Sequence, residues 1–417
     1  MNQEKLFRND LLNSSTFLLS LILVVRSITV FTLDCMPPME SQYIFMAEKL
    51  FGSDEKIYIS FAPGYSAFLF LISKLTGSYK IASYLIFIFS STGFCFVIYK
   101  WIKEKYDSNP AIIALLLLFF FPNSAITYTG YSHCIVAALF FLTLACYRYW
   151  KLWRNETTIN HITFIFSALA AMALRPEMVL FFIFLMFGFY FFRLTNLFSC
   201  IRSKLTWRLL LFPALLFSFM LIHKSFVQSR NINSNTTVFS DAFYSYRSFI
   251  SVYCFKQGEI FTDSLSIALS VPHFGTPEQN DNSILKAMLH NPFEVLKNVT
   301  YNFTQALKLI PHPLVVPFFL LPFFGLGLFY KEKKVFTDFN LFVLSAGIIP
   351  ILILFLFIVT VKYLSAITIP VIIISAFGIS KLENESLKRR IVSFLVFSFF
   401  IISAVYFISF LQAGARG

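Results

Sequence analysis

Apolar stretches that could cross a lipid bilayer recur along the chain, several of them short, and they constrain its fold more than any other feature. The candidate spans are residues 12–33, 81–99, 111–127, 134–149, 162–174, 178–192, 207–223, 314–330, 341–361, 364–380 and 391–411. Hydrophobic residues make up 57% of the sequence and charged residues only 13%. Because a backbone inside lipid must satisfy its own hydrogen bonds, such segments are expected to be helices. The sequence therefore predicts an all-α polytopic membrane protein.

Lysine and arginine gather in short runs between these segments, at residues 99–107, 147–155, 193–208, 330–334 and 381–390. Cytoplasmic loops of membrane proteins are enriched in these two residues, so all five runs are expected on the cytoplasmic side. An arrangement of about eleven spans, with the N-terminus inside and the C-terminus outside, satisfies this condition. The net charge of +13 is therefore interpreted as a topological signal and not as a nucleic-acid-binding surface.

Residues 61–77 are apolar but are predicted not to cross the membrane. A span there would move the basic run at 99–107 to the outside, and the segment is short and begins with Pro63 and Gly64. It is expected to be an interfacial or partly re-entrant helix. The chain is thus predicted to be a single integral-membrane domain, residues 1–417. Its two large external parts are a first loop at 34–80 and a second segment at 224–313.

Several classes of function lack their sequence signature. No phosphate-binding glycine loop is present, which argues against an ATP-driven transporter, and no pair of matching broken helices indicates an inverted-repeat carrier. The six cysteines show no metal-ligand spacing, so no metal or other cofactor is predicted. Cys35 and Cys254 both fall in the external segments, where a disulfide is permitted.

Two carboxylates follow the first span, in the stretch "LDCMPPMESQYIFMAEKLFG" at residues 33–52. Asp34 lies at the end of the span, and Glu40 begins a predicted amphipathic helix in which Tyr43 and Ala47 continue the same face. An acidic residue near a helix N-terminus is also ordinary dipole chemistry. This stretch alone leaves both a catalytic and a structural interpretation open.

The order of motifs along the chain resembles a family. An acidic residue is followed by "xxYxxxA" and "LFG", then by "FAPGYSAFLFLISKLTG" at 61–77, "ALRPEMVLFFIFL" at 173–185 and "VKYLSAITIPVIIISAFGI" at 361–379. This order is similar to that of integral-membrane glycosyltransferases of the GT-C fold, which take sugars from polyprenyl-phosphate donors. The family commonly has Asp where this chain has Glu40, and often Arg where it has Lys362. Within the family, the chain resembles the serotype-converting O-antigen glucosyltransferases of temperate phages.

The chemistry of sugar transfer suggests roles for individual residues. Inverting transfer needs a base to remove the acceptor's proton and a cation to hold the donor phosphate. Glu40 is the predicted base, with Asp34 as the alternate, and Arg175, Arg26 and Lys362 are the candidate phosphate-binding residues. The residues expected to contact the acceptor are Tyr43, Asp241, Tyr244 and Arg247. His133 is interpreted as a hydrogen-bonded residue at a helix start, in preference to an acid or base.

The predicted function is transfer of a sugar from a polyprenyl-phosphate donor to a lipid-linked glycan on the periplasmic face of the bacterial inner membrane. The narrower resemblance implies undecaprenyl-phosphate glucose as donor and an O-antigen repeat as acceptor; the expected partners are these lipids and the membrane, with no nucleic acid. A mannosyl or arabinosyl transferase of the same fold is an alternative. Two further alternatives are a flippase or transporter of lipid-linked glycans and a glycan polymerase or ligase.

Overall fold

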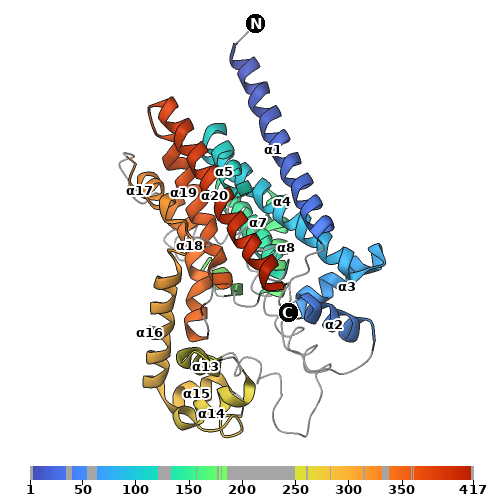
Figure 1. The fold of residues 1–417 in the computed structure, drawn as a ribbon, viewed down its shortest axis with the longest axis vertical. Coiled ribbons are helices and arrows are strands. Elements are labelled where there is room, and N and C mark those ends of the chain that lie inside the picture. The colour runs from blue at the N-terminus through green and yellow to red at the C-terminus, as the bar shows by residue number, and fades with distance from the viewer. Residues whose placement is uncertain are drawn as a thin grey trace, which may run out of the picture.

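The computed structural model describes residues 3–33, 40–53, 63–120, 133–155, 157–175, 178–179, 181–185, 249–259, 262–281, 283–312, 315–330, 338–357, 359 and 361–414. Within these ranges the regular structure is entirely helical (Figure 1). Three described segments are long and apolar enough to cross a membrane: Tyr79–Lys105, His133–Leu152 and Phe339–Leu356. Shorter apolar helices accompany them, among them Ser15–Phe31, Ser108–Phe120, Thr158–Leu174 and Leu364–Ser380. The helical, membrane-type character predicted from hydropathy is therefore confirmed.

The centre of the bundle is a parallel pair of helices, α4 (Tyr79–Lys105) and α7 (His133–Arg154). At one end Ser83 Oγ lies 2.6 Å from His133 Nδ1, and at the other the Tyr147 hydroxyl donates to Glu104 Oε1 over 2.6 Å. A Cβ added at Gly93 would lie 2.6 Å from the Phe140 ring, so glycine permits this close packing. Both helices therefore begin at the same end of the bundle.

The second half of the chain packs through glycine contacts. Helices α17 (Leu321–Phe329) and α19 (Thr368–Ser380) approach so closely that a Cβ at Gly327 would lie 2.1 Å from the Ile374 carbonyl oxygen. A Cβ at Gly378 would lie equally close to the Phe323 carbonyl oxygen, at 2.1 Å. Small residues at helix interfaces allow this kind of van der Waals packing in membranes, where hydrophobic association contributes little.

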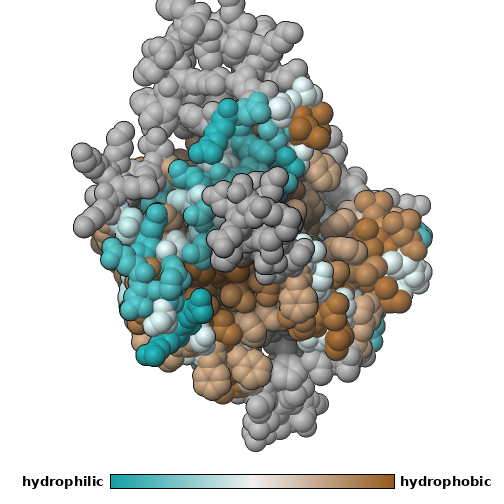
Figure 2. Space-filling model, turned by 90° about the horizontal axis from the view of Figure 1, so that it is seen from above, coloured by the Kyte–Doolittle hydropathy of each residue, from teal (hydrophilic) through white to brown (hydrophobic). Residues whose placement is uncertain are grey.

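The ends that carry basic residues meet at one end of the bundle, here called the basic end. The Tyr106 ring at the end of α4 stacks on Phe377 at 4.1 Å, and Lys381 lies over the Tyr330 ring at 5.1 Å. Lys151 of α7 pairs with Glu104 of α4 at 3.2 Å. Figure 2 looks onto this end and shows hydrophilic residues gathered there, with hydrophobic surface beside them. Basic runs far apart in the sequence are thus neighbours in space.

The first helix, α1 (Gln3–Leu33), runs antiparallel to α4. Phe31 near its end contacts the Tyr84 ring edge-on at 5.6 Å, close to the start of α4. The last helix, α20 (Glu385–Gly414), begins within the basic run at 381–390. In Figure 1 α1 begins at the top and α20 ends near α2, toward the opposite end of the bundle. This placement agrees with termini on opposite sides of a membrane.

Two short helices cover the end opposite the basic end: α2 (Glu40–Phe51) and α3 (Gly64–Thr76). The thirteen residues of α3 extend about 20 Å, less than the roughly 30 Å of a bilayer's hydrocarbon core. A Cβ at Gly64 would lie 2.1 Å from the Ala173 carbonyl oxygen, so this glycine lets α3 begin against the end of α8 (Thr158–Leu174). Gly77, with a φ of 70°, ends α3, and Ser78 caps α4.

The described part of residues 224–313, the predicted second external segment, is a small helical unit. It comprises α13 (Val252–Gln257), α14 (Asp263–Phe274), α15 (Ile284–His290) and α16 (Pro292–Leu309), around a core that includes Phe249, Tyr253 and Phe274. The Asn302 amide donates to the carbonyl oxygens of Phe355 and Phe357, each at 2.9 Å, and so ties α16 to the bundle. Figure 1 shows this unit below the bundle, toward the end where α2 lies.

Candidate active site

Glu40, the predicted base, is the first residue of α2, and its side chain is 0% exposed. Its Oε1 accepts hydrogen bonds from the Tyr65 hydroxyl and from Ser83 Oγ, the latter at 2.6 Å. Its Oε2 accepts from the backbone N–H of His133 at 3.3 Å. The three donors come from α3, α4 and α7, so the site is assembled where four helices meet.

The His133 imidazole completes this cluster. Its Nδ1 lies 2.6 Å from Ser83 Oγ and 3.8 Å from Glu40 Oε1. The ring packs against Phe87 at 4.8 Å between centroids and against Tyr84 at 6.4 Å. His133 is itself 0% exposed, and its Nε2 has no hydrogen-bond partner among the described residues. The cluster therefore contains a carboxylate, two hydroxyls and an imidazole with one unoccupied nitrogen.

Burying a carboxylate is costly unless donors replace the water it loses. Here hydroxyl and amide donors do so, and Glu40 also lies in the first turn of α2, where the helix dipole favours a negative charge. The donor from His133 is likewise a free N–H at the start of a helix. Burial, followed by the charge of Glu40, raises the pKa of Tyr65 well above its ordinary value. Tyr65 therefore remains a protonated donor.

Tyr43, predicted to contact the acceptor, is 7% exposed and packs edge-on against the Tyr65 ring at 5.0 Å. Its backbone carbonyl accepts from Ser66 Oγ at 3.0 Å. Tyr43 and Tyr65 belong to one cluster with Ala47, which lies one further turn along the face predicted from the sequence. In this structure Tyr43 holds α2 against α3, and its contact with an acceptor remains a prediction.

Arg175, the first candidate for the donor phosphate, lies at the same end of the bundle as Glu40. It is half-buried, directly after α8, and its N–H donates to the Ala171 carbonyl at 2.8 Å. The neighbouring Leu174 belongs to the cluster around Tyr65, and its carbonyl accepts from the Cys134 thiol at 3.4 Å. Arg175 is thus adjacent to the packing that surrounds the carboxylate.

The other candidate cations are placed differently. Arg26 is 4% exposed, and its Nη2 lies 3.9 Å from Cys95 Sγ. Cys95 is twelve residues beyond Ser83, about 18 Å along α4, so Arg26 lies deep in the bundle. Lys362 belongs to the 3-10 helix η3 (Val361–Ile367), but its side chain lies outside the described residues. The predictions for Asp34, Asp241, Tyr244 and Arg247 also fall outside the described residues.

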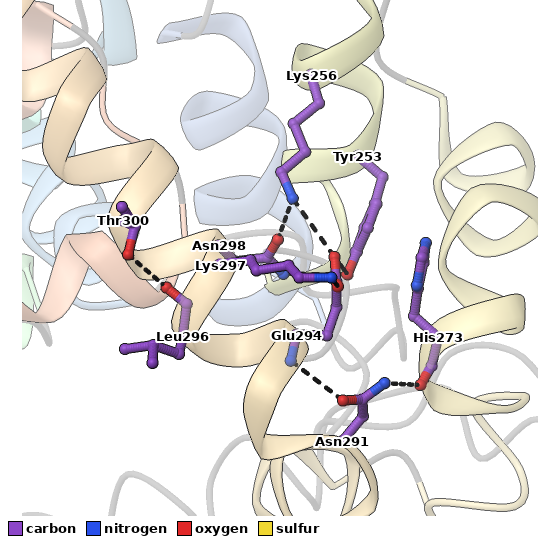
Figure 3. A network of polar contacts seen from close by, with 9 residues as sticks. All are labelled: Tyr253, Lys256, His273, Asn291, Glu294, Leu296, Lys297, Asn298 and Thr300. Carbon is purple, nitrogen blue, oxygen red and sulfur yellow. Dashed lines mark hydrogen bonds and ion pairs between the residues drawn. The ribbon is translucent and has the colours of Figure 1, made fainter.

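A second buried carboxylate, Glu294, lies at the start of α16 (Figure 3). It pairs with Lys297 at 3.1 Å and with Lys256 at 3.6 Å, and it accepts from the Tyr253 hydroxyl at 3.3 Å. The His273 ring stacks on Tyr253 at 5.1 Å. Burial alone raises the pKa of Glu294, but the Lys297 hydrogen bond and the Lys256 charge outweigh it and hold the pKa below its ordinary value.

Neither network resembles a metal site. Among the described residues, no group of three or more His, Cys, Asp or Glu side chains could hold a metal ion. Cys254 is a buried thiol 3.0 Å from Ser266 Oγ, and Cys35 lies outside the described residues, so the disulfide between them stays untested.

Sequence reasoning identified the carboxylate of this site and missed its partners. Tyr65 lies within the stretch 61–77 that resembles the family's, but neither Tyr65 nor Ser83, in the apolar helix α4, was predicted to contact the carboxylate. His133 was interpreted as a helix-start residue, which is correct, since it begins α7. The structure adds that the same residue contacts Ser83 and Glu40. The signal that could have drawn attention to it is a histidine at the predicted external end of a span.

A scan against models of known protein families finds no match to this chain, and a search of curated proteins finds no significantly similar sequence. The fold and its apolar helices define a helical protein of membrane type. Any function must therefore be argued from the site.

Proposed function

We propose that this protein is an integral-membrane glycosyltransferase of the GT-C type. It transfers a sugar, glucose by the narrower resemblance, from a polyprenyl-phosphate donor to a lipid-linked glycan such as an O-antigen repeat. The reaction takes place on the periplasmic face of the bacterial inner membrane, in a bundle of about eleven spans. The observation that carries the proposal is the buried Glu40 network at the end of the bundle opposite the basic residues.

The location of Glu40 suits this chemistry. If the basic end faces the cytoplasm, the carboxylate lies at the external side, near the depth where a lipid phosphate meets water. In an inverting transfer the acceptor oxygen attacks the anomeric carbon, the carbon–phosphate oxygen bond breaks, and the electron pair leaves with the polyprenyl phosphate. A base must take the acceptor's proton, and Glu40 is the carboxylate available for it.

The donor phosphate requires a cation at the same depth. Arg175 meets this condition, because it follows Leu174 at the edge of the Tyr65 cluster. A guanidinium can donate two parallel hydrogen bonds to a phosphate, which fixes its orientation as well as its charge. Arg175 is therefore proposed to hold the donor phosphate as the leaving group departs.

The proposal is tested with membranes that carry the protein and with the purified protein in lipid nanodiscs. Each is supplied with a panel of radiolabelled polyprenyl-phosphate sugars and a lipid-linked glycan acceptor. We expect transfer from one donor by the wild-type protein, loss of transfer in Glu40→Gln, and full transfer in Glu48→Gln. Glu48 is the matched control because it lies on the same helix but is exposed. Absence of transfer from every donor would contradict the proposal.

One observation favours an alternative. Arg26 is a buried cation within the bundle, and buried cations in membrane helices often mark a path for anions. This placement would suit a flippase that moves lipid-linked glycans. A flippase changes the leaflet of its lipid without forming a glycosidic bond, so a leaflet assay with a fluorescent lipid-linked glycan separates the two functions.

A further inference from the structure

If the proposed function is correct, the Glu40 site must remove the proton of the acceptor hydroxyl. Glu40 is 0% exposed, and both of its carboxylate oxygens already accept hydrogen bonds within the protein. Glu40 is thus already solvated by three donors of the protein, two on Oε1 and one on Oε2. The one side-chain atom of the cluster that lacks a partner among the described residues is His133 Nε2.

The hydrogen bonds of Ser83 couple the tautomer of His133 to the protonation of Glu40. Ser83 Oγ lies 2.6 Å from Glu40 Oε1 and 2.6 Å from His133 Nδ1, yet a hydroxyl has a single proton to donate. When that proton is donated to the Glu40 carboxylate, Nδ1 must carry a proton and donate it to Ser83. A neutral imidazole protonated on Nδ1 has its lone pair on Nε2.

The opposite arrangement is equally consistent with the two distances. If Ser83 donates to Nδ1, then Glu40 must be protonated and donate to Ser83, and Nε2 carries the imidazole proton. The two arrangements differ by the shift of one proton along each hydrogen bond. They are therefore two states of the same series of hydrogen bonds, before and after His133 has taken up a proton at Nε2.

We propose that Glu40, Ser83 and His133 form a proton relay in which His133 Nε2 takes the proton of the acceptor hydroxyl. As the new glycosidic bond forms and the sugar–phosphate bond breaks, the hydroxyl proton moves to Nε2. The Nδ1 proton moves to Ser83 Oγ, and the Ser83 proton moves to Glu40. The products are a neutral imidazole, an intact serine and a protonated Glu40, with the leaving electron pair on the polyprenyl phosphate.

The burial of His133 favours a hydrogen bond from the acceptor hydroxyl to Nε2. A buried ring nitrogen without a hydrogen-bond partner is unfavourable, and a ligand hydroxyl that donates to it removes this penalty. The contacts with Phe87 and Tyr84 fix the plane of the ring, which keeps Nδ1 on Ser83 and leaves Nε2 for the substrate. Glu40 remains the base that finally holds the proton, His133 is the residue that contacts the acceptor hydroxyl, and Ser83 passes the proton between them.

The first test reads the tautomer directly and does not depend on activity. The sequence contains six histidines, so ¹⁵N-histidine-labelled protein in nanodiscs gives few signals, and His133 is identified by its absence in His133→Asn. We expect the resting protein to carry the His133 proton on Nδ1. In Ser83→Ala the partner of Nδ1 is lost, and the Nε2-protonated form should appear. A resting His133 protonated on Nε2 would overturn the relay.

The second test measures transfer. His133→Asn keeps a donor near Ser83 but removes Nε2, so kcat should fall by at least about 100-fold while the KM for the donor is retained. Ser83→Ala should also lose most of its kcat, and Ser83→Thr, which keeps the hydroxyl, should restore it. Near-normal kcat in folded His133→Asn or Ser83→Ala, beside an active wild type, overturns the relay alone. An inactive wild type with the expected tautomer overturns the proposed function instead.

Discussion

The two carboxylates that are buried in the described part of the chain have similar settings and different partners. Glu40 and Glu294 each lie in the first turn of a helix, and each accepts from a tyrosine hydroxyl. Glu294 is paired with two lysines, whereas the partners described for Glu40 are hydroxyls, an amide and an imidazole. Lysine pairs keep a carboxylate charged, while a serine–histidine chain can deliver a proton to it. The same residue type thus serves as an ion-pair centre in one place and as a candidate proton acceptor in the other.

The largest expected effect separates the two carboxylates by activity. Glu40→Gln keeps the size of the side chain but cannot take up a proton, so transfer should fall by at least about 100-fold. Glu294→Gln should keep transfer within a few-fold of wild type. The measurement is the initial rate of sugar transfer by folded protein in nanodiscs. Equal losses of transfer in both variants would contradict a catalytic role for Glu40 and a structural role for Glu294.

A third variant, Asp34→Asn, tests the alternate base that the sequence predicted. Asp34→Asn should be milder than Glu40→Gln if Asp34 only supports the first external loop. Both variants are assayed at the same protein level in the same membranes. If Asp34→Asn were the inactive one, the base would lie six residues earlier, where the first span ends.

The next effect concerns the cation that the Glu40 site needs. Arg175→Ala should weaken use of the donor by about 10- to 100-fold, since hydrogen bonds to a charged group contribute about 1.5–3 kcal/mol. Arg175→Lys should rescue it only in part, because lysine offers a point charge and not a two-pronged donor. The dependence of rate on donor concentration measures this. Unaltered donor affinity in Arg175→Ala would remove Arg175 from the site.

Glu294 should instead govern the stability of its own helical unit. Glu294→Gln leaves two lysines without their counter-charge, and α13–α16 should exchange amide hydrogen faster, measured by hydrogen–deuterium exchange of residues 252–309. Lys297→Gln is the matched control and should have a smaller effect, because its side chain is 58% exposed while that of Glu294 is 8% exposed. No change in exchange in Glu294→Gln would contradict a structural role.

Acid should weaken the same unit. Burial alone would raise the pKa of Glu294. The Lys297 hydrogen bond and the Lys256 charge outweigh it and hold the pKa below its ordinary value of 4.5. A depressed folded-state pKa contributes stability that is present above the ordinary pKa and is lost as the pH falls through the folded-state pKa. Exchange in α16 should therefore rise as the pH falls below about 4.5 and should respond less to acid in Glu294→Gln. An identical pH response in both proteins would exclude Glu294 as its cause.

Glu40 and Glu294 should both lie on the outer side of the membrane. Cysteine labelling tests this location, and the substitutions it needs should have little effect on function. In a cysteine-free background, cysteines at Ser60, Ser78 and Glu278 should all react with an impermeant reagent from outside. A cysteine at Asp107, at the basic end, should react only after the membrane is opened. A Ser78 position reached only from the cytoplasm would make the predicted span count wrong.

Much of the fold could be predicted because hydropathy and charge act locally. The segments at 81–99 and 134–149 lie within α4 and α7, which are long enough to cross a membrane. The span expected at 341–361 corresponds to α18 (Asp338–Leu352), which contains Pro350 and is followed by a 3-10 helix at Ile353–Leu356. The helical segment is therefore shorter than predicted. The spans predicted at 178–192 and 207–223 fall largely or wholly outside the described residues. The full count of about eleven spans therefore remains a prediction.

The sequence by itself determined that the chain is helical and apolar and that Glu40 begins a helix after the first apolar segment. Each of these follows from composition within a window of one helix length. Only the tertiary structure decided that Tyr65, Ser83 and His133 surround Glu40, since they lie 25, 43 and 93 residues further along the chain. Such contacts depend on which helices run parallel and how closely glycines such as Gly64 and Gly93 let them pack. No local pattern encodes that geometry, because it arises from the packing of distant segments.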